Sequence, residues 1–285
     1  MKVKYYLLSI AIIGMLSACS GEKKESNTST ASSTEKKVDT DQPTGDVFIY
    51  TPEHRKSKTQ PDKAKVLISK KLASINTNEF KSNTTIEEIW IGEQVQHIAS
   101  GAFDGCTSLK KIHLAGPLPV INDGAFAGCS ALEELNGDVY TIGVNGFKGC
   151  TSLKSVVLDE HAYWIRVGAF DGCKNLKKII LADTMSKLED GAFDGCTAME
   201  EFSIPNDFKN RMFGMFPNQD KFRKVYLLTT EFYPLPKNCQ PNQQCTLYVP
   251  DAFVSQFKAD EQWSQFGSIE PMSKSKYYSA EGFLK

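Results

Sequence analysis

Apolar residues recur along the middle of the chain with a period of about 23 residues, separated by polar and turn-forming positions. Phenylalanine marks the period at Phe103, Phe126, Phe147, Phe170 and Phe193, at intervals of 23, 21, 23 and 23 residues. Phe80 and Phe216 continue the frame on either side, and Val66 and Ile68 indicate a partial unit before it. A fixed period of this length is the signature of a repeat architecture, in which each unit covers the apolar edge of the next.

Within each unit, apolar residues lie six, nine and eleven positions after the phenylalanine. The last two flank one residue that is usually polar, which is the alternation of a half-buried β-strand. Another apolar residue lies five positions before each phenylalanine except Phe216, where Arg211 takes its place. The pattern predicts an α/β repeat solenoid with 23-residue coils and one parallel sheet along one face, its strands about 4.8 Å apart.

Turn-forming residues flank every phenylalanine. Two positions before it, all seven units carry glycine or asparagine, which predicts backbone in the left-handed region. Two positions after it they carry glycine, serine or asparagine, which indicates a second tight turn. Close packing of the backbone is the alternative, but Asn78 and Asn145 favour the left-handed turn because asparagine is not small.

The repeated unit, I-x-x-x-A-F-x-G-C-x-x-L-x-x-I-x-L, resembles the BspA-like leucine-rich repeat of bacterial surface proteins. The resemblance runs from Ile75 to Leu227, and the segment from Leu247 to Pro271 is similar to the one that closes such domains. It implies a leucine-rich-repeat fold and an extracytoplasmic interaction protein, since adhesion to host proteins is described for some members. The motif residues are themselves the core, so they do not identify a ligand.

The C-terminal segment predicts a cap for the last coil. Asp251, which follows Pro250, is a good N-cap for a short helix. Large apolar residues then recur at Phe253, Phe257, Trp263, Phe266 and Ile269, enough to cover the apolar end of a solenoid. We therefore assign an N-terminal cap with a partial repeat to residues 46–74, leucine-rich repeats to 75–230, and a helical, aromatic C-terminal cap to 231–285.

The N-terminus predicts export and lipidation. A basic start and an apolar stretch of 12 residues, Tyr5 to Leu16, form a signal peptide over residues 1–18, too short to span a bilayer. Leu16 to Cys19 resembles a bacterial lipobox, which implies a lipid on Cys19. Residues 19–45 are polar and predict a flexible tether. We expect anchoring in the cell envelope, at the surface of the outer membrane; the inner membrane or an inward face is the alternative.

Charge and composition narrow the range of partners. The whole chain carries 33 basic and 34 acidic residues, and loss of Lys2 and Lys4 with the signal peptide leaves 33 − 2 = 31 basic residues and a net charge of −3. There is no basic stripe, so nucleic acid is not expected as a partner. We expect a monomer that binds a protein or a glycan.

Five cysteines, Cys106, Cys129, Cys150, Cys173 and Cys196, lie three positions after their phenylalanines. A buried column of small apolar thiols explains them better than a metal or redox ladder, because stacked coils hold Cβ atoms too far apart for disulfides. Cys239 and Cys245 lie instead in a loop rich in Pro, Asn and Gln. An exported protein permits a disulfide there, and a pair of free thiols is the alternative.

Catalytic and metal-binding patterns find little support. The four histidines show no metal-ligand spacing, and there is no nucleophile elbow, phosphate loop or zinc-protease helix. Asp104, Asp171 and Asp194 recur before glycine, but Ala127 and Lys148 fill the same position in other units, which argues against a calcium ladder. We therefore predict no cofactor, no metal and no enzyme activity.

The outward face of the predicted sheet is the candidate binding surface. It consists of the positions eight and ten residues after each phenylalanine, which we call the first and second outward positions. The residues that we select there are Trp90, His113, Val157, Lys178, Ile180 and Tyr226. Exposed aliphatic and aromatic side chains on a sheet favour a protein partner. A carbohydrate-binding protein that uses exposed aromatics, Tyr163 and Trp164 among them, is the second hypothesis, an envelope enzyme is the third, and cover by flanking loops is the non-functional alternative.

Overall fold

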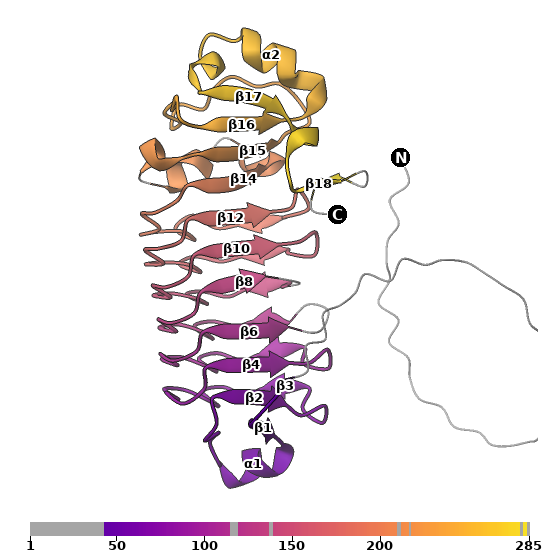
Figure 1. Ribbon diagram of the computed structural model, residues 1–285, viewed down its shortest axis with the longest axis vertical. Helices are drawn as coiled ribbons and strands as arrows, with labels where there is room; N and C mark the ends of the chain where they lie inside the picture. Colours follow the sequence, from indigo (N-terminus) through magenta and orange to yellow (C-terminus); the bar gives the residue numbers. More distant parts are fainter. Residues whose placement is uncertain are drawn as a thin grey trace, which may run out of the picture. The chain divides into compact units, whose positions relative to one another are not determined.

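The computed structural model describes residues 43–114, 119–136, 139–209, 212–216, 218–279 and 282–283. The predicted signal peptide, Cys19 and most of the tether lie outside these residues. The described coils stack in sequence order, and the leucine-rich-repeat solenoid predicted from the sequence is confirmed (Figure 1).

One long strand from each coil forms a face of parallel strands. Hydrogen bonds join these strands in the orders β1-β2-β4-β6 and β17-β16-β15-β14-β12-β10-β8. Between the two groups, Glu133 N donates to Lys110 O at 3.3 Å, so the stacking continues. The strands are β1 Val47–Tyr50, β2 Lys65–Ile68, β4 Glu88–Ile91, β6 Lys111–Leu114, β8 Glu134–Asn136, β10 Ser155–Leu158, β12 Lys178–Leu181, β14 Glu201–Pro205, β15 Lys224–Leu228, β16 Thr246–Val249 and β17 Ser268–Pro271.

A second parallel sheet lies along the coils, where we predicted only one. The isoleucine row five positions before the phenylalanines supplies its inward residues. Its two-residue strands are β3 Ser74–Ile75, β5 His97–Ile98, β7 Val120–Ile121, β9 Thr141–Ile142, β11 Trp164–Ile165 and β13 Lys187–Leu188. Two residues are too short a stretch to show alternation, so the pattern revealed the apolar row and not its strands.

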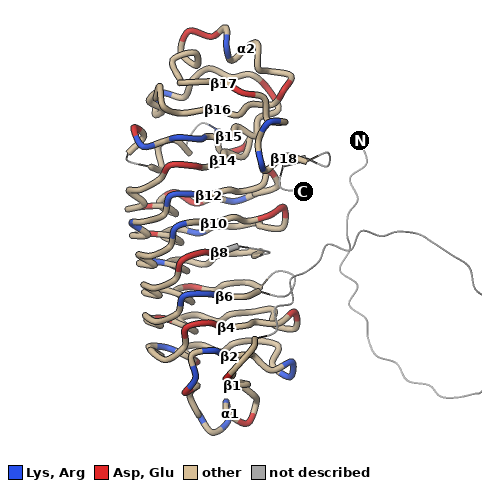
Figure 2. The backbone as a smooth tube through the Cα atoms, in the orientation of Figure 1, with Lys and Arg blue, Asp and Glu red and all other residues tan. Residues whose placement is uncertain are grey.

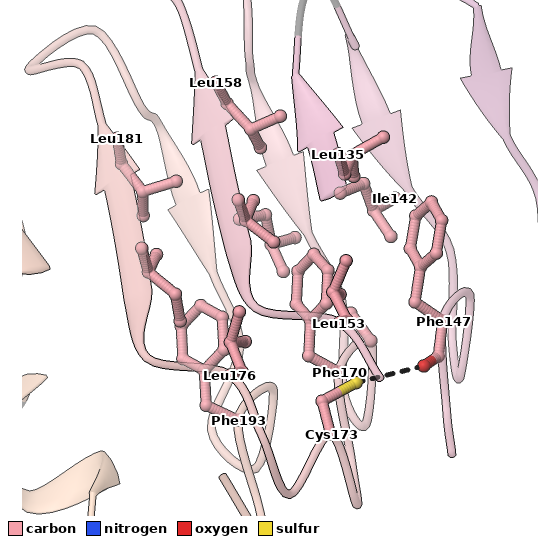
Figure 3. Close-up of a cluster of buried hydrophobic side chains, with 14 of the residues drawn as sticks. Leu135, Ile142, Phe147, Leu153, Leu158, Phe170, Cys173, Leu176, Leu181 and Phe193 are labelled. Carbon is pink, nitrogen blue, oxygen red and sulfur yellow. Dashed lines mark hydrogen bonds between the residues drawn. The ribbon is translucent and has the colours of Figure 1, made fainter. Parts of the chain in front are cut away.

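The phenylalanines form a continuous stack through the middle of the coils. From Phe80 to Phe216, neighbouring ring centroids are 4.9–5.6 Å apart. The leucine and isoleucine rows close around this phenylalanine ladder from both sheets (Figure 3). Tyr50 packs edge-on against Phe80 at one end, and Phe222 packs edge-on against Phe216 at the other.

The buried cysteine column has a second role besides packing. Each Sγ–H donates to the backbone oxygen of the phenylalanine in the preceding coil, as Cys173 does to Phe147 at 3.2 Å (Figure 3). The other four thiols make the same bond at 3.0–3.4 Å. Polar residues replace cysteine at the ends and bond differently: Gln219 donates to Phe213 O of its own coil and to Asn238 O, and Asn83 Oδ1 accepts from two backbone N–H groups. The five thiols of the central coils are therefore small donors that link neighbouring coils.

The left-handed turns are confirmed in six of the seven units. Asn78 and Asn145 have φ of 55° and 57°. The glycines at the same position of four other units have φ of 63–77°: Gly101, Gly124, Gly168 and Gly191. Gly214 is the exception, because it lies in a 3₁₀ helix. Gly101 illustrates the constraint, since a Cβ there would come within 2.3 Å of the Asn78 side chain.

The helices of the described residues lie towards the two ends of the stack of repeats. Helix α1 is capped by Thr51, and its Arg55 binds the Glu79 carboxylate, with Nη2 2.8 Å from Oε2. At the other end α2 lies next to β17 (Figure 1). The helices are α1 Pro52–Ser57 and α2 Val254–Ala259, and the 3₁₀ helices are η1 Asn206–Phe208, η2 Met212–Met215, η3 Gln219–Lys221, η4 Asp251–Phe253, η5 Trp263–Gln265 and η6 Met272–Lys274.

The predicted C-terminal cap is only partly correct. Phe257, Trp263, Phe266 and Ile269 are buried against the last coils. Asp251 is not the N-cap of α2, because it begins a 3₁₀ turn and its carboxylate accepts hydrogen bonds from Ser273 N and Oγ at 3.1 and 2.6 Å. Strands β16 and β17 also extend the long-strand sheet beyond the repeats that the pattern identified.

Candidate functional site

Basic and acidic residues alternate from one long strand to the next over much of the stack, as the colours of β4, β6 and β8 show (Figure 2). The predicted alternation at the first outward position is present, but ion pairs form one residue earlier. There, Lys110 and Glu87, Lys154 and Glu133, and Lys177 and Glu200 pair at 2.7–3.0 Å. These pairs are largely exposed, so each contributes little to stability, about 0–1 kcal/mol.

The prediction that Ile180 and Tyr226 face solvent is wrong. Ile180 is 0% exposed and Tyr226 is 1% exposed, although both occupy the second outward position. They form a small apolar cluster with Leu228 and Met272 on the outside of the sheet. The non-functional alternative, cover by a flanking segment, is correct for this half of the face.

The cover is the chain's own C-terminal segment, residues 272–279, which we call the strap. After β17 it runs back past β16 and β15 towards β14 (Figure 1). The Tyr277 ring packs edge-on against Tyr226 with centroids 5.3 Å apart, and Lys276 Nζ lies 3.5 Å from Glu201 Oε1. Tyr226 donates its hydroxyl to the same oxygen at 2.8 Å. Burial, together with this carboxylate, raises the pKa of Tyr226 far above its ordinary value.

Val157 and Lys178 lie at the border of the covered region. Val157 is half-buried and packs against the apolar cluster that the strap closes. Lys178 is half-buried at the first outward position of β12 and pairs along the backbone with Glu201. Neither residue lies on a fully open surface.

The first four long strands have a different outward face. Their second outward positions hold Ile49, Leu67, Trp90 and His113, which follow one another on adjacent strands. Ile49 is 53% exposed and the other three are partly exposed, in contrast to the covered residues of the other half. We call these four residues the open row. The sequence did not identify Ile49 and Leu67 as binding residues, because the repeat pattern is only partial at β2 and does not reach β1.

Trp90 and His113 form a stacked pair within the open row. Their rings are 4.4 Å apart and nearly parallel, at 4°. Trp90 Nε1 is buried without a hydrogen-bond acceptor in the described part of the chain. His113 Nε2 lies 3.5 Å from Glu88 Oε2, and it is buried without a hydrogen-bond partner among the described residues.

A second aromatic group lies on the short-strand sheet. Tyr140 and Tyr163 stack 5.2 Å apart, and Lys187 Nζ lies 4.7 Å from the Trp164 ring centroid and 5.7 Å from that of Tyr163. The Arg166 guanidinium also lies over Trp164, at 5.1 Å. A bound sugar would stack on the faces of these aromatic rings. The protein's own cations and a neighbouring ring already contact these faces.

Cys239 and Cys245 are buried free thiols in the structure. Burial raises the pKa of Cys245 to about 12 and that of Cys239 further. A disulfide between the two remains a prediction.

A cavity of about 420 Å³ opens between the ends of β12, β15 and β16 and the strap, with Asp183 and Asp251 on its wall. Across the described residues, no three His, Cys, Asp or Glu side chains are grouped closely enough to hold a metal ion. Within the same residues, no helix has the length and apolar character needed to cross a membrane.

The stacked parallel strands, the phenylalanine ladder and the glycine turns define a leucine-rich-repeat solenoid. The family model for the BspA type leucine rich repeat region matches in six copies, over residues 62–139 and 134–239. The chain belongs to this family. A comparison with curated proteins finds no match.

Solved structures of other bacterial proteins are similar, and two of the following three are described as leucine-rich repeat proteins. The T. pallidum leucine rich repeat protein TpLRR is 27% identical, and the match covers 50% of this chain and 70% of that chain at a TM-score of 0.47. A leucine-rich repeat protein from Bacteroides ovatus is 19% identical over 70% of this chain and 64% of that chain, with a TM-score of 0.37. The pneumococcal vaccine antigen PcpA is 15% identical over 79% of this chain and 82% of that chain, with a TM-score of 0.32. The chain thus spans less than two thirds of the Bacteroides protein.

Proposed function

We propose that this protein is a lipid-anchored, extracytoplasmic scaffold that binds another protein through the open row of its long-strand sheet. Lipid on Cys19 holds it in the envelope, and the polar tether places the repeats at the cell surface. Family membership and the lipobox support this location. In this proposal the protein binds its partner and does not catalyse a reaction.

The contrast between the two halves of the sheet face carries the proposal. The strap covers the apolar outward residues of β12 and β15, whereas the described residues leave those of β1, β2, β4 and β6 partly exposed. Apolar and aromatic residues beside a charged row are the composition of a protein-binding surface, in which tryptophan is a frequent energetic centre. The engaged rings of the short-strand sheet give less support to the carbohydrate alternative.

Photo-crosslinking on intact cells tests the proposal. A photoreactive residue at Leu67, in the open row, should give adducts with surface proteins of a neighbouring or host cell. The matched control is the same residue at Val167, which is 46% exposed and follows β11 of the short-strand sheet. Adducts that are absent, or equal at both positions, would refute binding through the open row. Protease treatment of the same cells tests location, because an inward-facing protein would be protected.

A further inference from the structure

The strap shows what kind of chain this sheet face binds. Its contacts with the sheet include those of four side chains: Met272 fills the apolar cluster, Tyr277 packs on Tyr226, the Lys274 ammonium binds Glu270 of β17 at 2.8 Å, and the Lys276 ammonium lies 3.5 Å from Glu201 of β14. The segment therefore combines apolar and aromatic contacts with two cations placed on carboxylates, of which Lys276 lies on the carboxylate that also accepts the Tyr226 hydroxyl. The strap thus binds the sheet face through the kinds of contact that a separate peptide would make.

The groups that receive the strap occur a second time on the sheet. Glu201 is at the first outward position of β14, and Tyr226 is at the second outward position of β15, one coil later. Glu88 and His113 have the same relation on β4 and β6. A lysine, Lys224 or Lys111, precedes each of the two aromatic residues by two positions.

The local geometry of the two sites agrees in part. In each, an aromatic group lies close to the glutamate of the preceding coil: Tyr226 donates a hydrogen bond of 2.8 Å to Glu201, and His113 Nε2 lies 3.5 Å from Glu88 without a hydrogen bond. Each aromatic ring also stacks on a ring of an adjacent strand, Tyr226 on Tyr248 of the following coil at 4.9 Å and His113 on Trp90 of the preceding coil at 4.4 Å. The two sites therefore share a glutamate paired with an aromatic ring one coil later, and they differ in the side on which the second ring stacks.

Among the described residues, a strap covers only one of the two sites. The side chains of Glu88 and His113 are 26% and 34% exposed, whereas that of Glu201 is 17% exposed and Tyr226 is almost fully buried. The open site offers a carboxylate beside a flat two-ring stack. It carries the charge and the aromatic surface that the strap uses on the other site.

We propose that Glu88, Trp90 and His113 bind an extended peptide segment of a protein partner in which a lysine precedes an aromatic residue. The ammonium lies on the Glu88 carboxylate, and the aromatic ring packs against the stack of Trp90 and His113. This partner chemistry rests on the proposed function and specifies it. The carboxylate and the stack are separate contacts, so each can be removed alone.

A labelled peptide made of Pro271 and the strap, PMSKSKYYS, tests the proposal by fluorescence polarisation against the full chain. Saturable binding should weaken about tenfold in Glu88→Gln, the loss of one charge-assisted contact, and at least as much in Trp90→Ala. The control Glu134→Gln changes the same outward position on β8, where no aromatic pair follows, and should bind as the wild type does. A peptide with its lysine at 276 changed to glutamate should also bind at least tenfold more weakly.

Three results would overturn this partner chemistry. One is no saturable binding of the peptide, and another is binding that Glu88→Gln leaves unchanged. The third is a photoreactive peptide that crosslinks to β14 and β15, because it would then only displace the strap. If the peptide does not bind and the protein instead binds a glycan, and if Trp90→Ala abolishes that glycan binding, then the ligand of this site is a carbohydrate. Adducts at Leu67 without peptide binding would leave the scaffold function standing and remove only this inference.

Discussion

Phe147 lies in the middle of the phenylalanine ladder and tests whether the stack holds the coils together. Its ring is fully buried, 5.2 Å from Phe126 and 5.5 Å from Phe170. Replacing a buried phenylalanine by alanine costs about 3–5 kcal/mol. We expect Phe147→Ala in the upper half of this range, because two ring contacts of about 0.5–1.5 kcal/mol each are lost together. The coils on both sides are held apart by their own rings and cannot collapse into the space.

Urea denaturation followed by tryptophan fluorescence measures this cost. Phe147→Leu keeps most of the volume and should cost less than about 2 kcal/mol. Val167→Ala, on the exposed surface, is the matched control and should change the free energy of unfolding by less than about 0.5 kcal/mol. A loss below about 2 kcal/mol for Phe147→Ala, or an equal loss for Phe147→Leu, would refute the reasoning.

Three further predictions concern the thiol column, the strap and the anchor. Burial raises the pKa of Cys173 from 9.0 to about 12, so the stability contributed by the protonated thiol is complete below about pH 9 and is lost between pH 9 and 12. Urea denaturation above pH 9 should therefore show a steeper loss in the wild type than in Cys173→Ala, and equal slopes would contradict the prediction. Ile180→Asp should destabilise the fold by about 3 kcal/mol or more, whereas Leu67→Asp should cost less than about 1 kcal/mol; equal losses in denaturation experiments would mean that the strap does not cover Ile180. Cys19→Ser should leave an unprocessed precursor or a soluble protein in cell fractionation, and normal processing with membrane partition would exclude lipidation.

The repeat core could be derived from the sequence because each of its constraints is local. A phenylalanine every 21 or 23 residues, with glycine or asparagine two positions before it, specifies one coil, and each coil needs only its neighbour to bury its edge. The cysteine column was correctly placed in the interior for the same reason. Its hydrogen bonds to the preceding coil were not predicted, because they depend on the offset between coils that only the stacked backbone sets.

The outward face of the sheet was decided by a contact between distant segments. Alternation along a strand determined that Ile180 and Tyr226 point away from the core, and this is correct. Whether such a residue meets water depends on what else packs there, and the strap reaches Ile180 from about ninety positions along the chain. Strand periodicity contains no information on this contact, since it arises from where β16 and β17 place the end of the chain. The sequence by itself therefore determined the coil, its core and the direction of each side chain, and the tertiary structure alone decided which half of the face is open to a partner.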